Sequence, residues 1–308
     1  MSGLCGHKKL TVAVRRDFLC GGRAEEEDSR EKEEAYFAAR ERAEFYAGIW
    51  GAPLVTLTAQ RPARPDELIV EFSEEGVALL ADGMRNQGDF ERFLGRLRPG
   101  CWEREMLIKA ARFRKKEQTA EPLSESPGKD KERPRPNGLR ALDATAGMGE
   151  DALILAAAGF TVELAEQDPI IHLLLEDSIT RAREGEEIYL RQLVSGMRLL
   201  EGNSIPWMRA AQPGYWDLIY LDPMFPERKK SALVKKKFQL LHYLERPATD
   251  EQELLQAALS ARPKKIVIKR PLKGPDLGGQ RPSYRIRGKA IRYDVIVPSH
   301  CSDRGEGV

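Results

Sequence analysis

A glycine turn between two acid-tipped hydrophobic segments is the part of this sequence best suited to hold a nucleotide cofactor. Gly147 and Gly149 let the backbone turn tightly and approach a ligand, and the helix expected after them offers its N-terminal amides. Glu166 lies nineteen residues after Gly147, at the end of the next hydrophobic segment, where a carboxylate can accept both hydroxyls of a ribose. This spacing predicts a nucleotide-cofactor cradle.

The turn by itself fits two classes of cofactor. The segment from Gly147 to Ala152 also matches the alanine form of the dinucleotide fingerprint, so NAD is an alternative to S-adenosylmethionine. Glu150 and Asp151 stand at the mouth of the expected helix, where they would repel a pyrophosphate. Carboxylates there suit the partly cationic methionine end of S-adenosylmethionine, which favours that cofactor.

A second stretch indicates which reaction the cradle would serve. A buried strand is expected up to Leu221, and Asp222-Pro223-Met-Phe225-Pro follows it, a loop of the kind that amino methyltransferases place beside the donor methyl. An exocyclic base amine is a poor nucleophile because its lone pair is delocalised into the ring. Acceptors at the Asp222 carboxylate and the Pro223 carbonyl would stabilise charge developing on the nitrogen, and the Phe225 ring would stack on the base.

The strand expected between these two stretches ends in Glu201-Gly-Asn203-Ser204. The Asn203 amide could bind the edge of an adenine, and Ser204 would cap the helix that follows. Capping is the alternative to ligand binding for both residues.

Basic residues follow the Asp222 loop and flank the next strand. With the basic stretch 281–292 they are expected to form a rim that binds RNA phosphates while a flipped base enters beside Phe225. A solvated helix face is the alternative for 235–237, and Lys264 and Lys265 belong to the same expected rim. The residues assigned to RNA binding are Lys229, Lys230, Lys235, Lys236, Lys237, Lys269 and Arg270.

Alternating strands and helices must position these residues. Strands are expected at 139–143, 161–165, 197–201, 216–221 and 264–269, helices near 150–158, 170–183, 204–211, 231–244 and 250–260, and a terminal hairpin over 284–297. This order predicts a Rossmann-like α/β fold with a mostly parallel seven-stranded sheet. Ligands on such sheets bind at the carboxyl ends of the strands, beside the switch in strand order.

A small α/β subdomain is expected ahead of this fold. Strands are expected at 10–14 and 54–57, a helix over 29–50, a hairpin over 68–80 and a basic helical stretch over 89–116, with Trp50 in the core. Residues 117–136 are proline-rich and charged, which is typical of a linker. The predicted division is an accessory subdomain at 1–116, a linker at 117–136 and a methyltransferase domain at 137–308.

Composition narrows the class of protein. With 41% hydrophobic and 32% charged residues, the sequence fits a soluble globular protein. No apolar run approaches the ~18–20 residues that span a bilayer, and the N-terminus lacks the apolar core of a signal peptide, so a cytoplasmic location is expected. The cysteines are scattered without a paired motif, so neither a disulfide framework nor a metal site is expected; they are Cys5, Cys20, Cys101 and Cys301.

Three segments resemble the bacterial ribosomal RNA small-subunit methyltransferase J family. They are Asp143-Ala-Thr-Ala-Gly-Met-Gly-Glu-Asp-Ala, Asp222-Pro-Met-Phe-Pro with the following Lys230-Ser-Ala-Leu-Val-Lys-Lys, and Ile268-Lys-Arg-Pro. The resemblance covers roughly 137–297. The chain departs from the family at Glu150-Asp151, where Arg-Asp is usual, and at Glu166-Gln167, where Glu-Arg is usual.

The resemblance implies a class I methyltransferase that transfers methyl from S-adenosylmethionine to N2 of a guanosine in 16S ribosomal RNA, with that RNA or the small subunit as partner. It implies donor contacts at Glu150, Asp151, Glu166, Gln167, Asn203, Ser204 and Asp222. With Asp143, Gly147 and Gly149 of the glycine turn these are the predicted cofactor-binding residues, and the loop gives the predicted catalytic residues Asp222, Pro223 and Phe225. The alternatives are the same chemistry on adenine or another RNA, a nicotinamide dehydrogenase, and an RNA-binding module whose methyl-transfer site is silent.

Overall fold

The structure is a computed structural model that describes residues 8–15, 26–58, 64, 66–113, 138–223, 240, 243–244 and 250–298. The chain forms two compact units, neither of them a continuous segment. The first comprises Met1–Glu91, Asp168–Glu187 and Phe225–Pro247, and the second Arg92–Gln167, Ile188–Met224 and Ala248–Val308. The linker expected at 117–136 lies outside the described residues, and the predicted boundaries at 116 and 137 stay a prediction.

The first unit is built on a five-stranded sheet with the order β2-β1-β3-β4-β5. Its central strand β1 runs parallel to β2 and β3, and the remaining pairs are antiparallel. The strands are β1 (Lys9–Arg15), β2 (Leu54–Leu57), β3 (Glu67–Ser73), β4 (Gly76–Ala81) and β5 (Met84–Asn86). This confirms the strands expected at 10–14 and 54–57 and the hairpin expected over 68–80.

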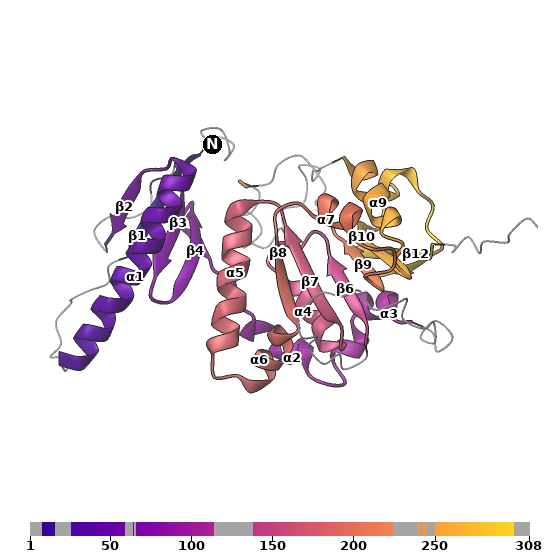
Figure 1. The fold of residues 1–308 in the computed structure, drawn as a ribbon, viewed down its shortest axis with the longest axis horizontal. Helices are drawn as coiled ribbons and strands as arrows, with labels where there is room; N and C mark the ends of the chain where they lie inside the picture. Colours follow the sequence, from indigo (N-terminus) through magenta and orange to yellow (C-terminus); the bar gives the residue numbers. More distant parts are fainter. Residues whose placement is uncertain are drawn as a thin grey trace, which may run out of the picture. The chain divides into compact units, whose positions relative to one another are not determined.

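A long helix, α1 (Glu26–Trp50), lies across the first strands of this sheet (Figure 1). Trp50 is buried, and the ring of Tyr46 stacks on that of Phe72 from β3 with 5.7 Å between centroids. The predicted core position of Trp50 is therefore confirmed. Helix α5 (Pro169–Glu184) belongs to the same unit and packs against β4.

The strand β5 was not expected from the sequence. Asp82 and Gly83 connect it to β4 with positive φ angles of 51° and 71°, which is the backbone of a type I′ hairpin turn. The Asp-Gly pair is a strong hairpin signal, so the sequence contains the local cue for this turn and for the short strand after it.

The second unit holds a seven-stranded sheet with the order β11-β12-β10-β9-β6-β7-β8. Neighbouring strands from β10 to β8 are parallel, whereas β12 pairs antiparallel with β10 and β11. The strands are β6 (Arg140–Asp143), β7 (Thr161–Glu166), β8 (Met197–Glu201), β9 (Leu218–Leu221), β10 (Lys265–Pro271), β11 (Tyr284–Arg287) and β12 (Ile291–Ile296). The predicted mostly parallel seven-stranded sheet and its terminal hairpin are confirmed.

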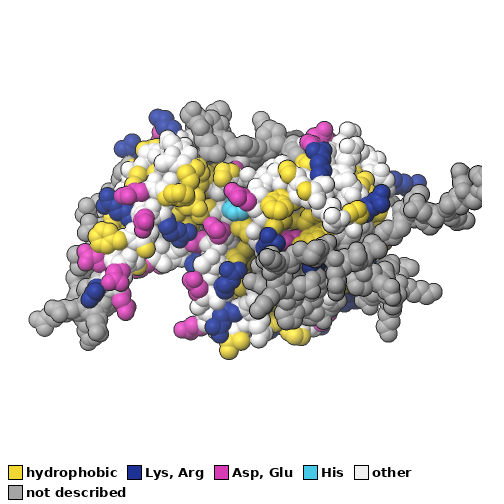
Figure 2. Space-filling view, viewed as in Figure 1, with side chains coloured by type: hydrophobic (Ala, Val, Ile, Leu, Met, Phe, Trp, Pro, Cys, Tyr) yellow, Lys and Arg dark blue, Asp and Glu magenta, His cyan; other side chains and the backbone are white. Residues whose placement is uncertain are grey.

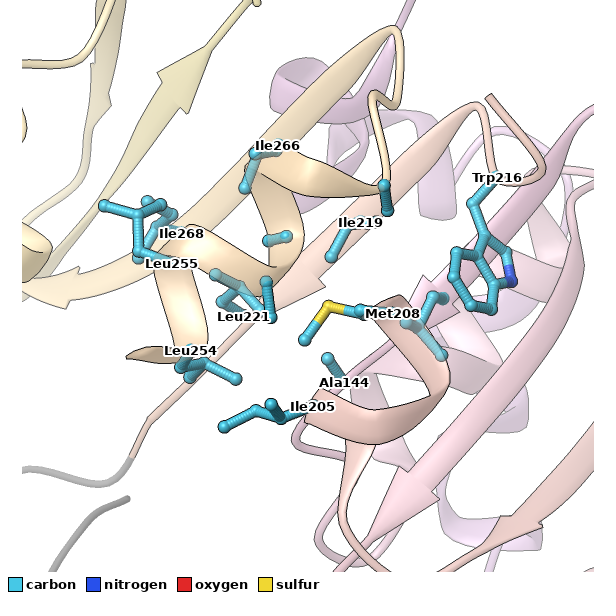
Figure 3. Close-up of a cluster of buried hydrophobic side chains, with 14 of the residues drawn as sticks. Ala144, Ile205, Met208, Trp216, Ile219, Leu221, Leu254, Leu255, Ile266 and Ile268 are labelled. Atoms are coloured by element: carbon cyan, nitrogen blue, oxygen red, sulfur yellow. The ribbon is translucent and has the colours of Figure 1, made fainter. Parts of the chain in front are cut away.

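Helices cover both faces of this sheet because strand side chains alternate between the faces. On one face α7 (Ser204–Ala210) and α9 (Glu251–Ser260) bury an apolar cluster that includes Leu221, Met208 and Ile268 (Figure 3). On the other face lies α4 (Glu150–Ala157), with α3 (Met106–Ala111) and α6 (Ile188–Ser195) against it. The sequence had not indicated α6.

The helical stretch expected over 89–116 was wrong as a continuous element. It divides into short pieces, α2 (Leu94–Leu97), a 3-10 turn at Trp102–Arg104 and α3. Arg98 is extended ahead of Pro99, and Gly100 has a φ of 86°, so the Pro-Gly pair interrupts the helix. The helix expected at 231–244 lies mostly outside the described residues. Within the described part of the chain, no helix is long and apolar enough to cross a membrane.

Candidate active site

The candidate site lies where the strand order of the second unit reverses. From β6 the chain proceeds to β7 and β8 on one side and then returns to β9 and β10 on the other. Asp143 ends β6 and Asp222 follows β9, its parallel neighbour, and the amide of Ala144 donates to the carbonyl of Tyr220 at 3.0 Å. This is the crevice at which open parallel sheets bind ligands.

The glycine turn joins β6 to α4 and bends back onto β7. Gly147 and Gly149 have φ angles of 53° and 75°, which L side chains adopt at a cost, and Gly149 is the N-cap of α4. The Gly147 amide donates to Oε2 of Glu166 at 2.8 Å. The two residues that the spacing had linked are thus in direct contact.

Asp222 is fixed through its backbone as well as its side chain. Its amide donates to Oγ1 of Thr145 at 2.6 Å, which connects the Asp222 loop to the glycine turn. Pro223 is buried directly after it. Thr145 was not among the predicted site residues, although it lies inside the quoted glycine motif.

A lysine connects the helix mouth to the Asp222 loop. Nζ of Lys269 lies 2.9 Å from Oδ2 of Asp151 and 2.7 Å from Oδ2 of Asp222. The hydroxyl of Tyr220 donates to the same Oδ2 of Asp151 at 2.6 Å. Asp151, Asp222 and Lys269, which the sequence had assigned to different roles, therefore form one hydrogen-bonded group.

Burial and crowding of carboxylates shift the protonation of these groups. Burial raises the pKa of Asp222 to about 6, against the opposing pull of Lys269. The pKa of Asp143 is raised well above its usual range, first by burial and then by the charge of Asp151. Burial disfavours the charge on Lys269, but Asp151 and Asp222 together raise its pKa, so it stays protonated.

Arg270, the neighbour of Lys269, has the opposite environment. Its side chain is 1% exposed, Nε donates to the carbonyl of Pro275 at 2.9 Å, and Nη1 donates to Oε1 of Glu251 at 3.1 Å. Successive strand residues face opposite sides of the sheet, so Lys269 faces α4 while Arg270 faces α9. The predicted contact of Arg270 with RNA is therefore wrong, because a buried side chain has no surface to offer.

The end of β8 carries Asn203, expected at the edge of an adenine, and Ser204, expected to cap the next helix. Asn203, which is exposed, is the N-cap of α7, and its side-chain oxygen accepts from the Ile205 amide at 2.8 Å. Ser204 is buried in the first turn of α7 and is not the cap, contrary to expectation. Gln167 is exposed directly after β7, and Glu150 is the half-buried first residue of α4.

The expected basic rim is only partly present among the described residues. Lys265 is buried, donates to the Arg112 carbonyl and lies over the Phe113 ring. Lys264 pairs with Asp217 at 2.9 Å at the amino end of the sheet, so neither lysine belongs to a rim around the site. Arg281, Arg287 and Lys289 are exposed. Figure 2 shows basic and acidic side chains interspersed on the visible face of the described residues. Outside the described residues lie Phe225, Lys229, Lys230, Lys235, Lys236 and Lys237.

Comparison with known proteins identifies the family. A family model described as "Putative SAM-dependent methyltransferase" matches residues 106–298. A Thioalkalivibrio sulfidiphilus protein named "Ribosomal RNA small subunit methyltransferase J" is 36% identical over 84% of this chain and 93% of its own length. This chain belongs to the small-subunit methyltransferase J family.

Other members and one solved structure agree with this assignment. Methyltransferases J of Marinobacter nauticus and Pseudomonas aeruginosa are each 46% identical over 51% of this chain, in alignments that span 56% and 59% of their own lengths. The crystal structure of a SAM-dependent methyltransferase from Neisseria gonorrhoeae has a TM-score of 0.58 and 28% identity, with 97% of this chain and 100% of that chain covered. The fold is that of class I methyltransferases.

The described residues fit the cofactor of this family. The glycine turn presents backbone in positive φ, and a Cβ on Gly147 would meet no atom within 4 Å, so space adjoins the turn. Carboxylates outnumber cations here, which suits a donor with an ammonium and a sulfonium. Asp151, Glu166 and Asp222 would hold the methionine and ribose parts. No group of three or more potential metal ligands occurs among the described residues.

Proposed function

We propose that this protein transfers a methyl group from S-adenosylmethionine to the exocyclic N2 amine of a guanosine in small-subunit ribosomal RNA, in the cytoplasm. The observation that supports this most is the hydrogen bond between the Asp222 loop and the glycine turn at the strand-order switch, because methyl transfer to an amine needs an acceptor loop next to the donor. The names of the family members supply the RNA substrate class.

The acceptor chemistry follows from Asp222 and Pro223. S-adenosylmethionine, when bound, supplies an electrophilic methyl on a sulfonium. The guanine amine is made nucleophilic when its N–H groups donate to the Asp222 carboxylate and the Pro223 carbonyl, which draws the lone pair out of conjugation. Transfer would form the C–N bond and break the C–S bond, which would leave the bond pair on sulfur and the positive charge on the nitrogen beside the Asp222 carboxylate.

Proton loss completes the reaction. The alkylated amine is acidic, and its proton passes to the Asp222 carboxylate or to water. With a pKa of about 6, Asp222 is mostly ionised at neutral pH and releases the proton again to solvent. No histidine is required as a general base.

The proposal is tested by an assay of methyl transfer from labelled S-adenosylmethionine. The acceptors are small ribosomal subunits and free 16S RNA, both taken from cells that lack this protein. Nucleoside mass spectrometry should find N2-methylguanosine in the treated RNA. N6-methyladenosine would assign the enzyme to adenine instead. Binding of NADH without binding of S-adenosylhomocysteine would contradict the cofactor, and binding of RNA without any transfer would indicate a silent module.

A further inference from the structure

Lys269 occupies a fixed place opposite Asp222. The pairing of β10 with β9 sets Ile268 beside Leu221, so the next residues on both strands, Lys269 and Asp222, come together at the carboxyl end of the sheet. On its other side Lys269 pairs with Tyr293 of β12. Its position therefore follows from the register of three neighbouring strands rather than from a surface loop.

The lysine binds one oxygen of each carboxylate. Both contacts are to Oδ2, at 2.9 Å in Asp151 and 2.7 Å in Asp222, and Tyr220 donates to the same oxygen of Asp151. No donor from the described part of the chain contacts Oδ1 of either residue. Within the described residues, the protein thus holds one oxygen of each carboxylate and contributes no donor to the other.

The charges around Asp222 explain why this lysine matters. Asp151 from α4 adds negative charge, Asp143 from β6 adds a further buried carboxyl group, and Lys269 is the strongest opposing cation, with Arg270 contributing less from the opposite face. Tyr220 from β9 and Tyr293 from β12 are neutral, since burial raises the pKa of both phenols. Without the lysine, no cation of the described residues would contact either the Asp151 or the Asp222 carboxylate.

We infer that Lys269 is a positioning residue for methyl transfer, which holds Oδ2 of Asp151 and of Asp222 so that Oδ1 of Asp222 is aimed at the acceptor amine and Oδ1 of Asp151 at the donor. The inference rests on the proposed function. It gives Lys269 a role inside the reaction site in place of the RNA contact expected from sequence. Its side chain is 26% exposed, and its charge is already matched by two carboxylates.

The substitution Lys269→Met tests this role, because it removes the charge and keeps the apolar stem. We expect kcat to fall about 100-fold, since a misplaced catalytic group costs that much. An opposite charge in contact lowers a carboxyl pKa by about 1–3 units, so its loss should move the acidic limb of the kcat/KM profile upward from about 6 by about one unit. Affinity for S-adenosylhomocysteine should fall by about three- to tenfold, the loss expected when one hydrogen bond to the donor is misaligned, and RNA affinity should not change.

Two further lysine variants keep the test decisive if the methionine variant folds poorly. Lys269→Gln keeps a donor without the charge and should show the same shift of the acidic limb with a smaller loss of kcat. Lys269→Arg restores the charge and should return the limb toward the wild-type value. Thermal unfolding of each variant checks the fold.

Lys264→Met is the matched control. Lys264 precedes the same strand and pairs with Asp217 at 2.9 Å, at the opposite end of the sheet. We expect its pH profile and kcat to equal those of the wild type. An unshifted acidic limb in folded Lys269→Met, or a loss confined to RNA affinity, would overturn the inference. A fully active Asp222→Ala variant would instead refute the proposed function, so the two failures are distinguishable.

Discussion

Carboxylates at the two ends of the seven-stranded sheet differ in how many donors they contact. At the amino ends, Asp217 accepts from the Arg140 amide at 2.8 Å through Oδ2 and pairs with Lys264 at 2.9 Å through Oδ1. Glu163 nearby accepts from the Trp216 indole at 2.7 Å and pairs with Arg198 at 3.3 Å. Each oxygen of these acids has its own donor, as expected of groups that serve the fold.

At the carboxyl ends the acids exceed the donors. Asp143, Asp151 and Asp222 approach one another, and among the described residues Lys269 is the cation in contact with two of them. Burial of negative charge in this arrangement costs stability, and a fold gains nothing from it. Among the described residues this surplus of acceptors occurs at the carboxyl ends, where the proposed donor, with its ammonium and sulfonium groups, would complete the site.

The sharpest test of this difference is the same substitution at both ends. Asp222→Asn keeps the shape of the side chain but replaces an ionised acceptor with an amide. We expect kcat for methyl transfer to fall by about 10²–10³, because an acceptor aimed at developing charge is lost. The melting temperature should stay constant or rise slightly, since one of the crowded charges disappears. Single-turnover kinetics and calorimetry measure the two quantities.

Asp217→Asn is the control for this comparison. It breaks the pair with Lys264, so we expect the melting temperature to fall by about 1–2 °C, the shift that a loss near 1 kcal/mol produces in a chain of 308 residues. Its kcat should equal that of the wild type. If Asp217→Asn slowed the reaction as much as Asp222→Asn, the two ends would not differ in function.

Two glycines allow a comparison of intermediate size. Gly147 and Gly214 have φ angles of 53° and 75°, and a Cβ would meet nothing within 4 Å at Gly147 and only the Arg262 carbonyl at 3.9 Å at Gly214. Alanine should therefore cost about 1–2 kcal/mol of stability at both, from the backbone alone.

Only Gly147→Ala should weaken binding at the donor site. Its methyl group would enter the space beside the turn, and we expect the affinity for S-adenosylhomocysteine to fall about tenfold or more, because an extra methyl group in a packed contact costs about 1–3 kcal/mol. Gly214 lies ahead of β9, at the amino end, so its variant should bind the donor normally. Titration calorimetry measures the affinity of both variants for S-adenosylhomocysteine. Equal losses of affinity would argue against the assigned cradle.

The sequence predicted those parts of the site that short local motifs specify. The glycine turn, the acid at the end of β7 and the loop after β9 were each recognisable from a short motif, and parallel strands then bring their ends together. Lys269 and Arg270 were harder, because two basic neighbours look equivalent in a sequence. Strand alternation separates them, and with the faces of β10 assigned from Ile266 and Ile268 it would have placed Arg270 under α9.

The remaining errors concern residues whose position depends on tertiary contacts, and a stretch in which short elements replace one long helix. Tyr220 was expected only as part of a buried strand, and its contact with Asp151 depends on how α4 sits on the sheet. The stretch over 89–116 has helical apolar spacing, yet Pro99 and Gly100 divide it. Proline and glycine there were sufficient to predict the interruption.

The smallest effect concerns Asp143, which is 1% exposed and accepts from the Thr145 amide at 3.3 Å. Its pKa is raised by burial and by Asp151, so the folded protein holds this proton at pH values where the unfolded chain, with a pKa of about 3.9, releases it. Stability from the protonated group is therefore present below about pH 4 and is lost as pH rises through the folded pKa.

Asp143→Asn removes this titration and keeps an acceptor, and its new amide can donate to the neighbouring carboxylates. We expect the variant to gain stability relative to the wild type as pH increases, by about 1–3 °C in melting temperature at neutral pH. Urea unfolding of both proteins across a pH series measures this difference. A difference that is constant with pH would mean that Asp143 is ionised in the folded protein, and that the carboxyl end tolerates more negative charge than the amino end.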